Sequence, residues 1–172
     1  MSIRIGQPAP ELEGKALMNG EIKEFKLSDY RGKNWVVLFF YPLDFTFVCP
    51  TEIRGFNAHA AEFEKIGAKV IGASVDSVHS HKAWVSGDLG PVSFPLFSDI
   101  TKDATRAYGI LDEENGVAFR GTFIIDDKGC VRSYVVNDDP IGRSVGETLR
   151  TVQALQTGAK TPCEWKPGEK TL

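Results

Sequence analysis

The sequence predicts an α/β fold, with one central mixed β-sheet covered by helices on both faces. Strongly apolar runs such as WVVLFFY at 35–41 and AKVIGASV at 68–75 alternate with segments of helical periodicity. A hairpin signal and one more helical segment follow towards the end of the chain. Such alternation is typical of parallel strands joined by crossover helices, and a strand that is apolar on both sides needs cover on both faces.

The elements of the first half follow from turn residues and apolar spacing. The turn signal MNGE separates the first two extended runs, and Gly67 is a suitable residue to end the first long helix. These signals predict extended runs at 11–17 and 22–27, a short helical turn at 28–29, a strand at 35–41 and a helix at 49–66.

The second half continues the alternation and closes with a hairpin and a helix. DKG at 127–129 is the hairpin signal, while Ser144 and Glu147 have the spacing of a capping box. The predicted elements are a strand at 68–75, a helix at 77–89, an extended piece at 93–99, a helix at 101–109, hairpin strands at 119–126 and 130–136, and a helix at 144–158.

The 172 residues favour one domain with a substantial core. We assign residues 1–158 to it. Residues 159–172 contain few apolar side chains, so we expect them to form a C-terminal arm that lies over other parts of the protein.

Composition argues against several function classes. The net charge is -3 and basic residues are scattered, which disfavours nucleic acid or an anionic membrane as partner. The first residues contain no apolar stretch typical of a secretory signal, so we expect a cytoplasmic protein. The odd number of cysteines, three, does not fit a disulfide scaffold, and no Cys/His spacing indicates a metal site. We therefore expect no metal and no cofactor.

Cys49 is the main candidate for chemistry. A lone cysteine is usually a small buried hydrophobe, and that remains the alternative. However, Cys49 follows a buried strand, at the strand end where open α/β sheets place ligands, and Pro50 suits the first turn of a helix. At a helix N-terminus the unpaired N–H groups favour a thiolate. Thr46 precedes Cys49 by three residues and offers a hydroxyl for the same site.

The segment FYPLDFTFVCPTE at 40–52 resembles the active-site segment of the typical 2-Cys peroxiredoxins, the alkyl-hydroperoxide-reductase-like branch. The resemblance extends over nearly the whole chain, including PAP near the start, RGTFIIDDKG at 120–129 and VNDDPIGRSVGETLRTVQALQ at 136–156. It implies a thioredoxin-like fold and a thiol-dependent peroxidase. Hydrogen peroxide and organic hydroperoxides would be reduced through a sulfenic acid at the reactive cysteine, with antioxidant defence as the role.

The family's P-x-x-x-T-x-x-C signature corresponds to Pro42, Thr46 and Cys49, and its distant arginine to Arg120. Lowering a thiol's pKa from ~8.5 to ~6 raises the thiolate fraction at pH 7 about thirty-fold, but falling nucleophilicity removes about ten-fold. A lower pKa of the cysteine alone therefore explains little of the reactivity that a specialised peroxidase needs. We expect Thr46 and Arg120 to orient the peroxide and stabilise the leaving oxygen, and Pro42 to shield the sulfur.

Two further residues have alternative interpretations. Glu52, in the first turn of the helix, would orient an arginine or would simply complement the helix N-terminus. Arg143 would be a second arginine of the site or a partner in a structural ion pair.

The resemblance implies a resolving cysteine, for which Cys163 in the arm is our candidate. Alignment on Trp165 to Gly168 places Thr161 at the family's usual cysteine position, two residues earlier. Whether the Cys49–Cys163 disulfide forms within or between chains stays open. We expect Cys130 to be a packed small residue, and the three histidines to be surface or core residues without a catalytic role.

The resemblance also implies partners. The disulfide would be recycled by thioredoxin, glutaredoxin or a dedicated flavoprotein disulfide reductase, and the chain would form homodimers that can close into decamers. The alternative function is an oligomeric holdase chaperone or redox-signalling partner with secondary peroxidase activity. A dithiol reductase is disfavoured, because Thr46 stands where the first cysteine of a C-x-x-C would be.

Overall fold

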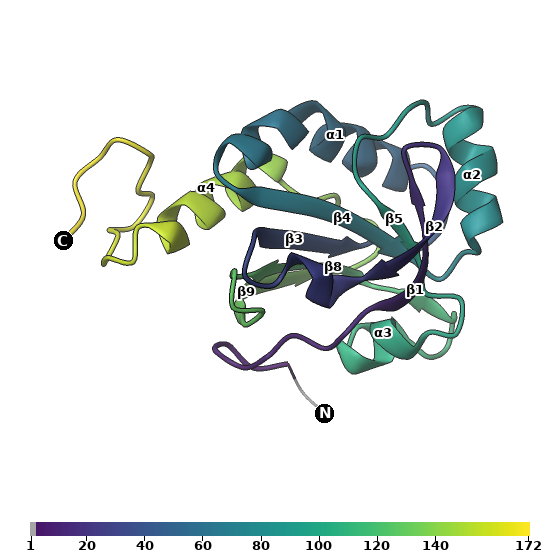
Figure 1. The fold of residues 1–172 in the computed structure, drawn as a ribbon, viewed down its shortest axis with the longest axis horizontal. Coiled ribbons are helices and arrows are strands. Elements are labelled where there is room, and N and C mark those ends of the chain that lie inside the picture. Colours follow the sequence, from purple (N-terminus) through teal and green to yellow (C-terminus); the bar gives the residue numbers. More distant parts are fainter. Residues whose placement is uncertain (1–2) are drawn as a thin grey trace.

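The structure, a computed structural model, describes residues 3–172 and contains a seven-stranded mixed sheet in the order β2-β1-β5-β4-β3-β8-β9 (Figure 1). Its strands are β1 (Glu13–Met18), β2 (Glu21–Lys26), β3 (Trp35–Phe40), β4 (Ala68–Ser74), β5 (Leu96–Ser98), β8 (Arg120–Ile125) and β9 (Val131–Asn137). The helices are η1 (Leu27–Tyr30), α1 (Cys49–Lys65), α2 (Val78–Ser86), α3 (Asp103–Ala107) and α4 (Val145–Gln156). β3 pairs in parallel with β4 and antiparallel with β8, which makes the sheet mixed.

Strand β3 lies inside the sheet, and its side chains point alternately into the two core layers on either face. Val37 and Phe39 pack with residues of α1, α2 and α4, whereas Val36, Leu38 and Phe40 pack on the other face with residues around α3. A strand buried on both sides reads as a continuous apolar run, which is why the sequence identified it. The expected cover of helices on both faces is confirmed (Figure 1).

The predicted elements are present, most of them shorter than expected. The predicted helix at 77–89 ends at Ser86, and the extended piece at 93–99 is regular only from Leu96 to Ser98. A second, two-stranded sheet was not predicted. It consists of β6 (Leu111–Asp112) and β7 (Val117–Ala118) and packs beside the start of β8. Strands of two residues are too short to show an apolar period.

Helix caps agree with the sequence signals in part. Ser144 Oγ accepts a hydrogen bond from the Glu147 backbone N–H at 3.2 Å, as a capping residue should. The Glu147 side chain does not complete the box, because it pairs with Arg150 at 2.6 Å. Only half of the predicted capping box is therefore formed.

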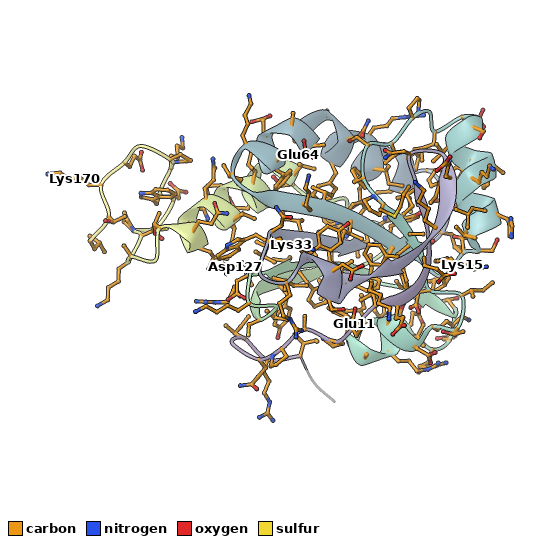
Figure 2. All side chains as sticks on the ribbon, in the orientation of Figure 1. Glu11, Lys15, Lys33, Glu64, Asp127 and Lys170 are labelled. Carbon is orange, nitrogen blue, oxygen red and sulfur yellow. The ribbon has the colours of Figure 1, made fainter. Side chains whose placement is uncertain are left out.

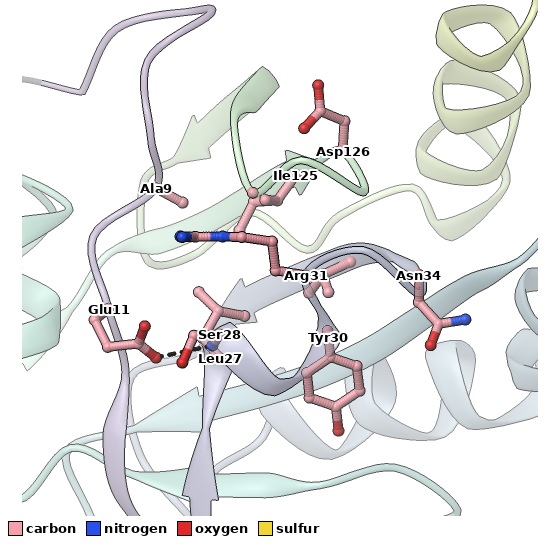
Figure 3. Close-up of a pocket in the computed structure, with 11 residues that line it drawn as sticks. Ala9, Glu11, Leu27, Ser28, Tyr30, Arg31, Asn34, Ile125 and Asp126 are labelled. Atoms are coloured by element: carbon pink, nitrogen blue, oxygen red, sulfur yellow. Dashed lines mark hydrogen bonds between the residues drawn. The ribbon is translucent and has the colours of Figure 1, made fainter.

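The N-terminal segment closes the sheet face opposite α1. A cavity of about 20 Å³ remains between this segment and η1, where Arg31 extends across the opening and Glu11 accepts from the Ser28 backbone N–H (Figure 3). A space of this size holds about one water molecule, so it is a packing gap and not a ligand site.

Charged side chains such as Lys15, Glu64 and Lys170 extend outwards from the fold (Figure 2). Among residues 3–172, no helix is long and apolar enough to cross a bilayer. After α4 the chain continues as the yellow segment at the left of Figure 1, away from the sheet. This arm is attached where Trp165, only 5% exposed, accepts from Arg150 through its backbone oxygen at 3.0 Å.

Candidate active site

Cys49 begins α1 immediately after the loop that leaves β3. Its side chain is completely buried, and Pro50 lies in the first helical turn. The first turn of a helix presents unpaired N–H groups and the positive end of the dipole, both of which favour an anion. All three cysteines are free thiols in this structure.

Arg120, the first residue of β8, supplies the positive charge beside the sulfur. Its Nη1 donates to Cys49 Sγ at 3.4 Å and to Glu52 Oε2 at 2.9 Å. The pairing of Phe39 with Thr122 in β3 and β8 explains how residues 71 positions apart meet. The sulfur and the arginine thus lie at the same end of two adjacent strands.

Glu52 connects Arg120 to Arg143. Arg143 donates to this carboxylate from its backbone N–H at 3.0 Å, from Nε at 2.9 Å and from Nη2 at 2.7 Å. The structure thus contains the expected contact between Glu52 and an arginine. Arg143 forms an ion pair with Glu52, three residues from Cys49 in the first turn of α1, so it is both an ion-pair partner and a neighbour of the site. Both guanidinium groups and the carboxylate have side chains no more than 3% exposed.

The ionisation of this cluster follows from its contacts. Burial alone would raise the pKa of Glu52, but hydrogen bonds and charge from Arg143, followed by the charge of Arg120, lower it below its usual value. Burial likewise opposes the charge on Arg120, yet Cys49 and Glu52 outweigh it and raise the pKa of the guanidinium. At neutral pH the site therefore holds two cations bridged by one carboxylate.

A pocket of about 530 Å³ lies in front of the cluster. Arg120 forms part of its wall, as do Pro42, Thr46 and Val48, whereas Cys49 lies behind these residues. Thr46 Oγ1 donates to the Leu43 backbone oxygen at 3.0 Å, so the lone pairs of this hydroxyl can accept a hydrogen bond from a substrate. Pro42 is buried and presents no N–H.

Two acidic residues of the pocket were not singled out from the sequence. Asp139 accepts from Arg120 Nη2 at 3.1 Å, and Asp112 lies on the opposite hairpin. Their approach depends on the loop after β9 and on the short β6–β7 hairpin. No local pattern in the sequence could have shown that these two residues line the pocket.

The site rests directly on the hydrophobic core. The Arg143 guanidinium lies 5.1 Å from the centroid of the Phe39 ring, which itself stacks on Phe56 at 4.3 Å. A cation over an aromatic face at this distance is a favourable contact. Core aromatic packing thus helps to fix the arginine that holds Glu52.

The remaining predicted residues lie elsewhere. Cys163 is exposed in the arm, and Cys130 is partly buried under the N-terminal segment. His81 is a fully buried core residue whose Nδ1 lies 2.8 Å from Asp44 Oδ2. Asp44 also accepts from the Tyr41 hydroxyl at 2.8 Å, so this pair anchors the loop that precedes Cys49.

Comparison with known proteins decides the family. The model of the AhpC/TSA family matches residues 5–134. The chain belongs to the AhpC/TSA family. It is 54% identical to Peroxiredoxin-2 of Rattus norvegicus, over 98% of this chain and 89% of that one. It is 51% identical to the chloroplastic 2-Cys peroxiredoxin BAS1 of Arabidopsis thaliana, over 98% of this chain and 67% of that one.

The fold agrees with this membership. The reduced 2-Cys peroxiredoxin of Plasmodium vivax superposes with a TM-score of 0.94 at 36% identity, covering 97% of this chain and 91% of that chain. The AhpC/TSA protein described here therefore has the thioredoxin-like peroxiredoxin fold, and it is a thiol-dependent peroxidase. These similarities do not favour the holdase or signalling alternative.

Proposed function

We propose that Cys49 is the thiol that attacks the hydroperoxide. The observation that carries this assignment is the 3.4 Å contact between Arg120 Nη1 and Cys49 Sγ at the helix N-terminus. A permanent guanidinium charge at this distance attracts the negative sulfur of a thiolate, and the thiolate is the nucleophile.

The reaction balances as follows. The Cys49 thiolate forms a bond to the terminal oxygen of the hydroperoxide, and the O–O bond breaks. Cys49 becomes a sulfenic acid, oxidised by two electrons, while the other oxygen leaves as hydroxide or alkoxide and takes a proton from solvent to give water or alcohol. Arg120 stabilises the leaving oxygen, and Thr46 accepts the hydrogen bond of the peroxide hydroxyl.

Pro42 and Val48 contribute by excluding water from the sulfur. Because Cys49 is fully buried behind the pocket wall, a resolving thiol reaches it only if the first turn of α1 opens. A peroxide molecule is far smaller than such a partner and needs much less displacement.

Cys163 is the proposed resolving cysteine, acting on the Cys49 of a second subunit. Gln156, at the end of α4, donates to the Ile66 backbone oxygen at 2.8 Å, so the arm starts beside the far end of α1. The 17 residues of α1 span about 25 Å. Seven residues from Gln156 to Cys163 reach about 24 Å only when fully extended, which would undock Trp165. Resolution across subunits avoids that strain.

Strand β9 offers the surface for a homodimer. It is one of the two edge strands of the seven-stranded sheet, and its residues Tyr134, Val135 and Val136 are 44%, 57% and 43% exposed. Unpaired strand edges with apolar side chains favour strand addition by another chain. We propose a symmetric dimer through this edge, with decamers as a further assembly.

The reductant is proposed to be a small dithiol protein, thioredoxin or glutaredoxin, or a flavoprotein disulfide reductase. We also propose that the protein acts in the cytoplasm. Peroxidase assays with each reductant in turn would rank them by kcat/KM.

The decisive experiment is Cys49→Ser, assayed by NADPH-coupled peroxide consumption. We expect loss of turnover in Cys49→Ser and near-normal turnover in the matched variant Cys130→Ser. Turnover close to that of the unsubstituted enzyme in Cys49→Ser would refute the assignment.

A further inference from the structure

The mouth of the active-site pocket carries a net negative charge. Among the described residues that line it, the charged ones are Arg120, Asp112 and Asp139. Two carboxylates and one guanidinium leave an excess of one negative charge on the pocket wall.

Two carboxylates offset the long-range attraction of the Arg120 guanidinium for an anion that approaches from solvent. It is 3% exposed and donates to Glu52 at 2.9 Å on its inner side. On its outer side it donates to the Asp139 carboxylate at 3.1 Å, and that side chain is 65% exposed. Asp139 therefore stands between the buried arginine and the solvent from which a substrate arrives.

Asp112 keeps its negative charge at neutral pH. Its carboxylate accepts from the Asn115 side chain at 2.7 Å and from the Asn115 and Glu114 backbone N–H groups at 3.2 and 3.0 Å. The hydrogen bonds from the Asn115 side chain and then its backbone hold the pKa of Asp112 below the usual value. Both carboxylates at the mouth thus repel anions.

We propose that Asp139, together with Asp112, makes this enzyme select neutral hydroperoxides over hydroperoxides that carry a negative charge near the peroxide group. The proposal rests on the assignment of Cys49 as the reacting thiol. Charges at a pocket entrance change the local concentration of charged substrates, while a neutral substrate is almost unaffected.

Asp139 can be tested without dislodging Arg120. The backbone oxygen of Asp139 accepts from Arg120 Nε at 2.5 Å, and this contact does not depend on the side chain. Glu52 holds the inner side of the same guanidinium. In Asp139→Asn the side-chain oxygen can still accept the hydrogen bond, so the substitution removes mainly the charge.

The experiment compares a short hydroperoxy carboxylate with its methyl ester, which differ by one negative charge. The rate of oxidation of the pre-reduced enzyme is measured by rapid quench without any reductant, so that the recycling partner has no influence. In Asp139→Asn we expect the rate ratio of ester to carboxylate to fall about three- to ten-fold at low salt, the effect of one charge about 8 Å away in a high effective dielectric. The difference should shrink at high salt.

Asp138→Asn is the matched control, because Asp138 is the neighbouring exposed carboxylate and does not line the pocket. Because Asp138 does not line the pocket, we expect Asp138→Asn to change the ratio clearly less than Asp139→Asn does, and Asp139→Glu to restore the ratio of the unsubstituted enzyme. An unchanged ratio in Asp139→Asn, or the same fall in Asp138→Asn, would overturn the proposal. Cys49→Ser tests the assignment of the reacting thiol separately. If that assignment is wrong, this variant will still be oxidised by the ester at the rate of the unsubstituted enzyme.

Discussion

Arg143 gives Glu52 three hydrogen bonds, one from its backbone and two from its guanidinium, across 91 positions of the sequence. The loop before α4 is thereby fastened to the first turn of α1, where Cys49 lies. We expect Glu52→Gln to lower the free energy of unfolding by about 3 kcal/mol, because Arg143 loses its counter-charge and Arg120 loses its buried one. Urea unfolding at pH 7 would measure it, with the exposed Glu62→Gln as control.

The effect of Glu52→Gln on the free energy of unfolding should depend on pH. The pKa of Glu52 is lowered in the folded state, so its ionised form stabilises the fold fully above the unfolded pKa of about 4.3. This contribution is lost as the pH falls through the lower, folded pKa. The stability difference between the unsubstituted protein and Glu52→Gln should therefore be full at pH 7 and shrink below pH ~4.3. A difference that grows on acidification would contradict the ion-pair interpretation.

Arg120→Lys should lower the rate constant for peroxide reduction by roughly 10²-fold, the usual effect of removing one donor that stabilises a developing oxyanion. A lysine keeps the charge but cannot donate to Cys49, Glu52 and Asp139 together. Stopped-flow oxidation of the reduced enzyme measures this rate. Arg132→Lys, at a half-exposed arginine of β9, is the control, and an equal loss in both variants would show that the effect is not specific to the site.

Cys163→Ser should abolish a peroxide-dependent dimer on non-reducing gels, while Cys130→Ser should retain it. The reason is the position of the arm beside the far end of α1. An oxidised band that stays at the monomer mass, yet depends on Cys163, would indicate a bond within one chain. If the dimer persists without Cys163, another cysteine resolves the sulfenic acid.

Tyr41→Phe should lower the free energy of unfolding by about 1–2 kcal/mol, because the buried Asp44 loses one of its donors. Burial, followed by the charge of Asp44, raises the pKa of Tyr41 well above its usual value, so the hydroxyl stays a donor. Thermal or urea unfolding would measure the loss. Tyr134→Phe is the control at a more exposed position, and an equal effect there would exclude the network as the cause.

Much of the fold could be predicted from the sequence, because β3, β4 and the long helices carry strong apolar periods. The β6–β7 hairpin could not, because two-residue strands show no period. The sequence also brought out Cys49, Thr46 and Arg120 through one family signature. It left Glu52 between two roles and missed Asp139, because both depend on contacts made only when distant loops meet.

The stacking of Arg143 on Phe39, and of Phe39 on Phe56, has a consequence for how the enzyme responds to heat and to core substitutions. The guanidinium that holds Glu52 lies directly on the aromatic core. A looser core would displace that guanidinium while the chain is still folded. Reactivity towards peroxide should therefore decline at temperatures below the midpoint of unfolding, and peroxide reduction would report on the packing of Phe39 and Phe56.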